Sequence, residues 1–119
     1  MTARPGIAFK IIDAAEWAAA MPTGAYAGAP IDLADGYIHL STQDQVEETA
    51  RRHFAGRSGL SLLTIDLVRL GDTVVWEPSG GGDLFPHIYG VLPVAAVTAE
   101  RAFLVDDDGA MIFSNGVSA

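Results

Sequence analysis

Leu60-Ser61-Leu62-Leu63-Thr64-Ile65-Asp66 is the stretch of sequence from which the fold can be argued. Its aliphatic and β-branched residues follow one another almost without interruption, which is typical of a central strand of a sheet. Helices are predicted only at about 14–21 and 43–55. Because these two short helices do not alternate regularly with strands, the order predicts an α+β fold with a mixed or antiparallel sheet. The other strands are predicted at residues 7–12, 37–41, 73–77, 97–105 and 110–113.

A single domain is expected from the length of 119 residues, with a core at about 7–113 and a flexible tail at 114–119. Residues 23–36 are predicted to form a long connection, and loops of that length are more often functional than short ones. The run Ser79-Gly80-Gly81-Gly82-Asp83 is predicted to be a mobile loop, because glycines have the most backbone freedom to lose on ordering.

The charge and cysteine content exclude several classes of function. Seven Lys and Arg residues stand against fifteen Asp and Glu, and Lys10 is the only lysine. A net charge of −8 argues against binding a nucleic-acid duplex or docking to an anionic membrane. The absence of cysteine removes disulfides, cysteine-ligated zinc and thiol nucleophiles. The chain has no apolar run of spanning length and no secretory leader, so a cytoplasmic protein is expected.

Candidate site residues begin with the strand at 37–41. Alternation along a strand places Tyr37, His39 and Ser41 on one face, and this face is polar where a core-facing strand would be apolar. We interpret the three as ligand-binding residues and His39 also as a catalytic candidate. The structural alternative is a histidine that holds a loop in place. Reactive and aromatic residues gather in three segments, at 26–35, 37–42 and 76–89.

The third segment supplies Glu77, Asp83, His87 and Tyr89. Glu77 ends a predicted strand and is a candidate general base or ribose-binding carboxylate, with a solvated acid as the alternative. Asp83, His87 and Tyr89 are candidate ligand-binding residues. A metal site built from His39, His87 and either acid is not predicted, because no spacing supports it.

Long segments of the chain resemble one bacterial family, the domain of unknown function 952, over about residues 7–104. The segments that carry the resemblance are Asp32-Leu33-Ala34-Asp35-Gly36-Tyr37-Ile38-His39-Leu40-Ser41-Thr42 and Trp76-Glu77-Pro78 through Phe85-Pro86-His87-Ile88-Tyr89-Gly90. Members of this family are described as similar in fold to ADP-ribosyltransferases. The resemblance therefore implies a split α+β sandwich with a central cleft for NAD.

In those enzymes a strand ends in His-Gly-Ser or His-Gly-Thr and contacts the ribose and nicotinamide of NAD. The resemblance places His39-Leu40-Ser41 there, with Leu40 in the place of glycine. Glu77 stands ahead of Glu100 for the glutamate that orients the ribose. The resemblance thus implies a nucleotide-binding cleft rather than transferase activity.

Three functions remain open at this stage. The first is a cleft around His39, Glu77 and His87 for a small molecule such as NAD or another nucleotide, with no cofactor established. The second is an acid/base hydrolase that uses His39 or His87 with Glu77. The third is a non-catalytic interaction module or homodimer, whose anchor would be an aromatic patch of Tyr26, Trp76, Phe85 and Tyr89.

Overall fold

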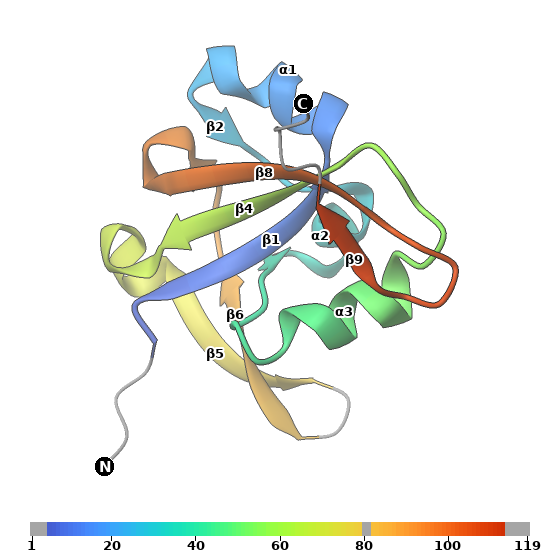
Figure 1. The fold of residues 1–119 in the computed structure, drawn as a ribbon. Helices are drawn as coiled ribbons and strands as arrows, with labels where there is room; N and C mark the ends of the chain where they lie inside the picture. The colour runs from blue at the N-terminus through green and yellow to red at the C-terminus, as the bar shows by residue number, and fades with distance from the viewer. Residues whose placement is uncertain (1–4, 80–81, 114–119) are drawn as a thin grey trace.

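Strand β4 (Leu60–Asp66) lies inside a four-stranded antiparallel sheet in the computed structural model, which describes residues 5–79 and 82–113 (Figure 1). It pairs with β1 (Ile7–Asp13) on one side and with β8 (Val97–Val105) on the other. The hairpin partner of β8, β9 (Met111–Phe113), forms the outer edge. The prediction of a central strand at residues 60–66 is confirmed.

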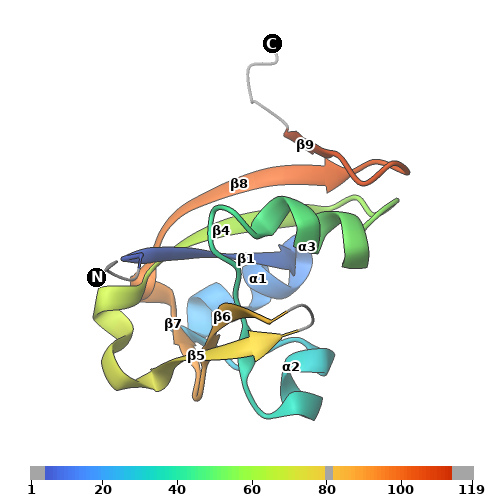
Figure 2. The same cartoon turned by 90° about the horizontal axis from the view of Figure 1, so that it is seen from below.

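A second, smaller layer faces this sheet. It is a three-stranded antiparallel sheet with the order β3-β6-β5, and Figure 2 shows it with α2 below the larger sheet. A two-stranded antiparallel pair, β2-β7, is separate from both sheets. The predicted α+β class with antiparallel, split sheets is confirmed. The strands are β2 (Ala25–Tyr26), β3 (Ile38–His39), β5 (Val74–Ser79), β6 (Asp83–Ile88) and β7 (Leu92–Pro93).

Three α-helices connect these strands within the described residues: α1 (Ala14–Ala20), α2 (Pro30–Asp35) and α3 (Val46–His53). The side chain of Asp13 caps α1 by accepting the N–H groups of Ala15 and Glu16. Short 3-10 segments follow at Met21–Thr23, Leu67–Thr73 and Val94–Ala96.

The strands β2 and β7, the helix α2 and the strand β6 are not among the predicted elements, and the last two bear on the site. The connection at 23–36 contains α2, where Pro30 occupies the first helical turn. Residues 83–88 form β6, the middle strand of the small sheet, although Pro86 is a residue that middle strands normally exclude. The predicted glycine-rich loop falls partly on residues 80–81, and the predicted tail on 114–119, which lie outside the described residues.

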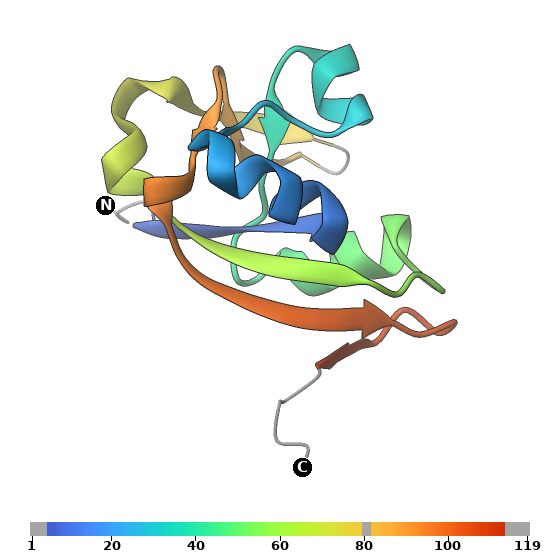
Figure 3. The same ribbon diagram turned by 90° about the horizontal axis from the view of Figure 1, so that it is seen from above.

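Alternation along β1 and β4 divides the core into two. Leu63 and Ile65 face the small sheet and α1, which lie on the same side of the large sheet in Figure 3. Leu60 and Leu62 face α3 on the other side. Lys10 lies between Ala8 and Ile12, so the pleat directs its side chain into the space between the two layers. It is 6% exposed.

Gly28 is predicted to be essential for the chain's entry into α2. It has a φ of +125°, and a Cβ placed on it would lie 2.9 Å from the Cβ of Asp32. Gly28→Ala should lower the free energy of unfolding by about 1–3 kcal/mol for backbone strain, plus the cost of displacing Asp32. Gly24→Ala is the matched control, since Gly24 also has a positive φ but a Cβ at that position would meet nothing within 4 Å. If urea unfolding showed the same loss of stability for Gly28→Ala and Gly24→Ala, the contact of the added Cβ with Asp32 would have no role.

Candidate functional site

Asp32 organises the turn from α2 into β3. Its carboxylate accepts the N–H of Ala29 at 2.8 Å, which caps α2, and the N–H of His39 at 3.1 Å. The residue is 1% exposed and the same oxygens also meet two side chains. A single buried carboxylate therefore fixes the start of the helix and the strand that follows it.

Lys10 is the first side-chain partner of Asp32. Its Nζ lies 3.0 Å from Oδ2 and 3.3 Å from Oδ1 of the carboxylate. Burial lowers the pKa of Lys10 against the opposing effects of Asp32 and the more distant Glu16. Burial alone would raise the pKa of Asp32, but the hydrogen bond from His39, the charge of Lys10 and the two backbone N–H groups hold it well below its usual range. The carboxylate is therefore ionised at neutral pH.

His39 is the second partner and lies between two carboxylates. Its Nδ1 is 2.6 Å from Oδ1 of Asp32, and its Nε2 is 2.9 Å from Oδ2 of Asp35. Both nitrogens of the ring are therefore occupied by carboxylates. The side chain is 34% exposed, so the ring is oriented from inside and still reaches solvent.

A second carboxylate–histidine pair lies beside the first. Nδ1 of His87 is 2.6 Å from Oε1 of Glu77, and the hydroxyl of Tyr89 donates to the same carboxylate at 2.8 Å. Tyr37 stacks on the His87 ring with a centroid distance of 4.1 Å, and the His39 and His87 centroids are 5.5 Å apart. Hydrogen bonds from His87 and Tyr89 lower the pKa of Glu77, and the bond to Glu77 raises the pKa of Tyr89.

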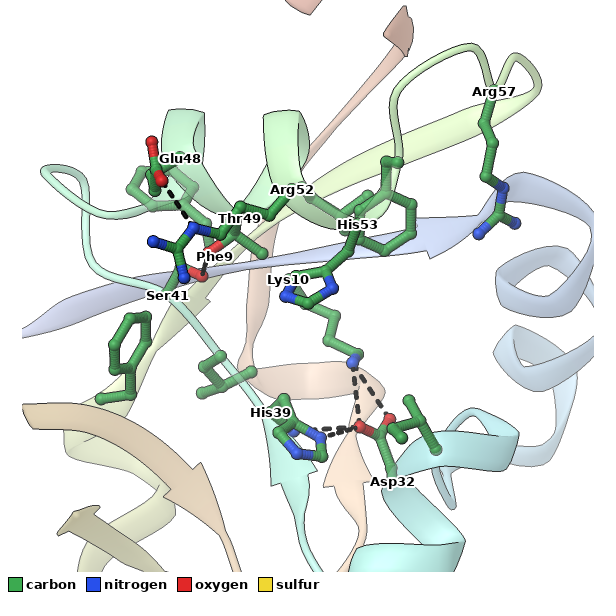
Figure 4. Close-up of a pocket in the computed structure, with 15 residues that line it drawn as sticks. Phe9, Lys10, Asp32, His39, Ser41, Glu48, Thr49, Arg52, His53 and Arg57 are labelled. Carbon is green, nitrogen blue, oxygen red and sulfur yellow. Dashed lines mark hydrogen bonds and ion pairs between the residues drawn. The ribbon is translucent and has the colours of Figure 1, made fainter. Parts of the chain in front are cut away.

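A pocket of about 440 Å³ opens on the other side of His39, between α3 and the α2–β3 turn (Figure 4). The ion pair of Lys10 and Asp32 and the ring of His39 form its polar floor. Aromatic and aliphatic side chains form its walls, and basic side chains stand at α3 and just after it. The walls and rim consist of Phe9, Ile11, Ile31, Leu40, Ser41, Glu48, Thr49, Arg52, His53, Phe54, Arg57 and Phe85.

The pocket exists because the outer edge of β1 is only partly paired. Phe9 exchanges both main-chain hydrogen bonds with Ser41, at 2.7 and 2.9 Å. In an antiparallel strand the residue two positions on has the same orientation, so the N–H and C=O of Ile11 also point away from β4. Among the described residues these two groups have no main-chain partner, and Ile11 lines the pocket. The edge therefore presents a free donor and a free acceptor.

The structure brings most of the sequence-predicted site residues together, in two environments. Tyr37, Glu77, His87 and Tyr89 form one connected group with His39. Only His39 of this group also lines the pocket, which it shares with Ser41. The Ser41 hydroxyl bonds to that of Thr49 at 2.9 Å and so anchors α3. Asp83 is exposed at the far end of β6 and belongs to neither environment.

The predicted aromatic patch is not found. Tyr26 is 5% exposed and packs against Trp17 in the core, where its hydroxyl meets Glu16 at 3.4 Å. Trp76 packs against the same core, Phe85 lines the pocket, and Tyr89 lies exposed beside Glu77. Alternation explains the separation, because Trp76 and Glu77 are neighbours on β5 and point to opposite faces. In the part of the chain that the structure describes, no group of three or more His, Cys, Asp or Glu side chains is placed to hold a metal ion.

Sequence reasoning misses Lys10, Asp32 and Arg57 as site residues. Asp32 stands within a predicted connection, and its pairing with Lys10 spans 22 positions along the chain. One signal is present: the chain's only lysine stands in the middle of an apolar strand, Ile7–Ile12. A lysine at such a position is expected to need a buried partner.

Asp32→Asn should strongly destabilise the protein, because it leaves the Lys10 ammonium buried without a countercharge. We expect a loss of about 3–5 kcal/mol in the free energy of unfolding at pH 7, measured by urea denaturation. Asp44→Asn, at an exposed acid on the loop before α3, is the control. A loss below about 1 kcal/mol would show that the pair does not support the fold.

The free energy of unfolding of the wild type should also fall in acid, because Asp32 loses its charge there. Its folded pKa lies below its unfolded value of roughly 4, so its contribution is complete above that value and disappears as the pH falls toward the folded pKa. Urea midpoints measured from pH 6 downward should decline less steeply in Asp32→Asn than in the wild type. If the urea midpoints of the two proteins fell equally steeply with pH, Asp32 would not be the source of the acid sensitivity.

The chain matches the model of a protein family described as "Protein of unknown function (DUF952)" over residues 11–100. It is similar to the crystal structure of protein CC0527 from Caulobacter crescentus, with 44% identity, a TM-score of 0.83, and coverage of 88% of this chain and 92% of that one. The solution NMR structure of CC0527 gives 43% identity, a TM-score of 0.78, and coverage of 89% and 91%. No curated protein matches. In the described residues no helix is long and apolar enough to span a membrane. The chain therefore belongs to the DUF952 family.

Proposed function

We propose that this protein binds a small organic anion, with a nucleotide as the best-fitting class, in the pocket between α3 and the α2–β3 turn. The observation that carries the proposal is the charge of that pocket. Three of the chain's seven basic residues, Lys10, Arg52 and Arg57, line it, although the whole chain has a net charge of −8. Basic residues concentrated in one concave site of an acidic protein favour an anionic ligand.

The local charge balance leaves one of these basic groups available. Lys10 is paired with Asp32, and Arg52 with Glu48 at 2.6 Å. Arg57 has no acidic partner among the described residues, and its guanidinium lies 5.0 Å from the centroid of Phe54. A phosphate or carboxylate at this rim would therefore meet an uncompensated cation.

The walls suit a planar group attached to the anion. Phe9, Phe54 and Phe85 contribute flat apolar surface, and a volume of about 440 Å³ falls in the range of small-molecule sites. The free N–H and C=O of Ile11 form a donor–acceptor pair that matches an amide or the edge of a base. The same features support NAD and other nucleotides, the ligands implied by the resemblance to ADP-ribosyltransferases.

Of the two histidines considered for acid/base catalysis, only His39 can meet a ligand in the pocket. His87 is 3% exposed, lies under the Tyr37 ring and does not line the pocket, so we assign its pair with Glu77 a structural role. His39 does line the pocket and is oriented by Asp32. Any proton transfer to a bound molecule is thus proposed for His39, without Glu77.

Binding of AMP, ADP-ribose and NAD should be detectable by calorimetry or by NMR titration at millimolar concentration. His39→Ala should weaken binding about 2- to 13-fold, which corresponds to one hydrogen bond of about 0.5–1.5 kcal/mol, made when the ligand replaces Asp35 at Nε2 of the ring. Arg57→Ala should weaken it about 3- to 10-fold, since a rim charge is partly screened. Arg69→Ala, which removes an exposed arginine outside the pocket, is the control for net charge.

The result that would refute the proposal is the absence of binding by any of the three compounds to folded wild-type protein. Equal weakening by Arg57→Ala and Arg69→Ala would refute the placement of the anion. Salt gives an independent check, because affinity should fall with ionic strength in the wild type and fall less in Arg57→Ala.

A further inference from the structure

The use of lysine in this chain is unusual. Lys10 is the only lysine in 119 residues, and it is 6% exposed. Lysines are among the residues least often fully buried, and their common place is the solvated surface. This one lies at the floor of the pocket, with its Nζ held 3.0 Å from Oδ2 of Asp32 (Figure 4).

We propose that Nζ of Lys10 forms an imine with the carbonyl carbon of a small organic anion that occupies this pocket. The inference deepens the proposed function and rests on it, because it names the reactive group of the ligand. The shared chemistry is an aldehyde or ketone on a molecule that also carries a phosphate or carboxylate. The anionic group meets the basic rim, and the carbonyl reaches the floor.

The reaction is balanced without a further reactant. The neutral amine of Lys10 attacks the carbonyl carbon, a C–N bond forms, and the oxygen takes up a proton to give a carbinolamine. Loss of that oxygen as water leaves a C=N bond, protonated on nitrogen. Overall, one ammonium and one carbonyl give one iminium and one water, so the positive charge beside Asp32 is the same before and after.

The neighbours of Lys10 suit each step. Asp32 is the countercharge of the ammonium and remains the countercharge of the iminium, so no buried charge is left uncompensated. His39 contacts the same carboxylate at 2.6 Å and lines the same pocket, and its Nε2, which meets Asp35 at the surface, is the nitrogen we propose to exchange protons with the ligand. Burial lowers the pKa of Lys10, which favours the neutral amine that attacks.

The walls place apolar groups around the proposed imine. Phe9, Phe54 and Phe85 line the pocket with aromatic surface, against which the C=N bond would lie. Among the described basic side chains that line the pocket, Lys10 alone can form an imine, because the others are arginine and histidine. A carbonyl compound bound in this pocket can therefore form an imine only with Nζ of Lys10.

The test is reductive trapping on the wild-type protein. Ribose 5-phosphate and levulinate, whose carboxylate is separated from its ketone by two methylene groups, are incubated separately with the chain and cyanoborohydride, and the modified residue is identified by peptide mass mapping. Hydride addition converts the imine to a stable secondary amine. We expect an adduct on Lys10 that is distinct from any on the α-amino group. Comparing the two compounds shows whether the pocket prefers a phosphate-bearing aldehyde or a carboxylate-bearing ketone.

Arg69→Lys supplies a matched control lysine. Arg69 is exposed and lies 3.4 Å from Asp66, so the substitution creates a surface lysine beside a carboxylate but outside the pocket. Lys10 should be modified about tenfold faster or more than this surface lysine, because the pocket holds the carbonyl in place. Lys10→Arg, which keeps the charge, should lose the adduct.

Equal rates at the two lysines would overturn the imine, because they would reflect ordinary amine chemistry. NMR shifts of pocket residues with either compound, but no adduct on Lys10, would also overturn the imine while leaving anion binding intact. The absence of both shifts and adduct, together with no binding of AMP, ADP-ribose or NAD, would overturn the proposed function as well.

Discussion

The buried ion pair of Lys10 and Asp32 is the constraint on which the rest of the structure depends. A charge enclosed between two layers is costly unless it is matched, and here each group compensates the other at 3.0 Å. Asp32 also caps α2 through Ala29 and fixes β3 through the N–H and the ring of His39. One carboxylate thereby joins the edge of the large sheet, a short helix and the first strand of the small sheet.

Local sequence patterns predict those elements whose own residues determine them. The apolar run of β4 and the strand–turn–strand pattern of β8 and β9 appear in the structure at or close to the predicted residues. The strand at β6 and the helix α2 escape prediction because each contains a proline, which usually breaks such elements. Pro30 is compatible with a first helical turn, and Pro86 lies just outside the two residues of β6 that pair with β3.

The sequence predicts the histidines, Glu77 and the tyrosines as candidate site residues, but it does not predict how they assemble or that Lys10, Asp32 and Arg57 join the pocket. Alternation places Tyr37 on one face with His39, but the contact of both with His87 depends on the register that pairs His39 with His87 across β3 and β6. That register joins positions 48 apart in the chain. The partnership of Lys10 with Asp32 is also a product of tertiary structure. Local periodicity contains no information on which distant strand a residue will face.

The pocket lies where the small sheet β3-β6-β5 separates from the edge of the large sheet. β1 is the edge of the large sheet, and it is joined to the chain after β3 only at the bridge of Phe9 with Ser41, because β3 itself pairs with β6 in the small sheet. Beyond this bridge the main chain of Ile11 is left free, and the side chain of its neighbour Lys10 points into the space between the layers. Because the pairing ends at this bridge, the edge of β1 keeps free hydrogen-bonding groups at Ile11, and the amine of Lys10 can be reached from the pocket. A ligand that hydrogen-bonds to the main chain of Ile11 and reacts with the amine of Lys10 would occupy the part of the β1 edge that has no partner strand.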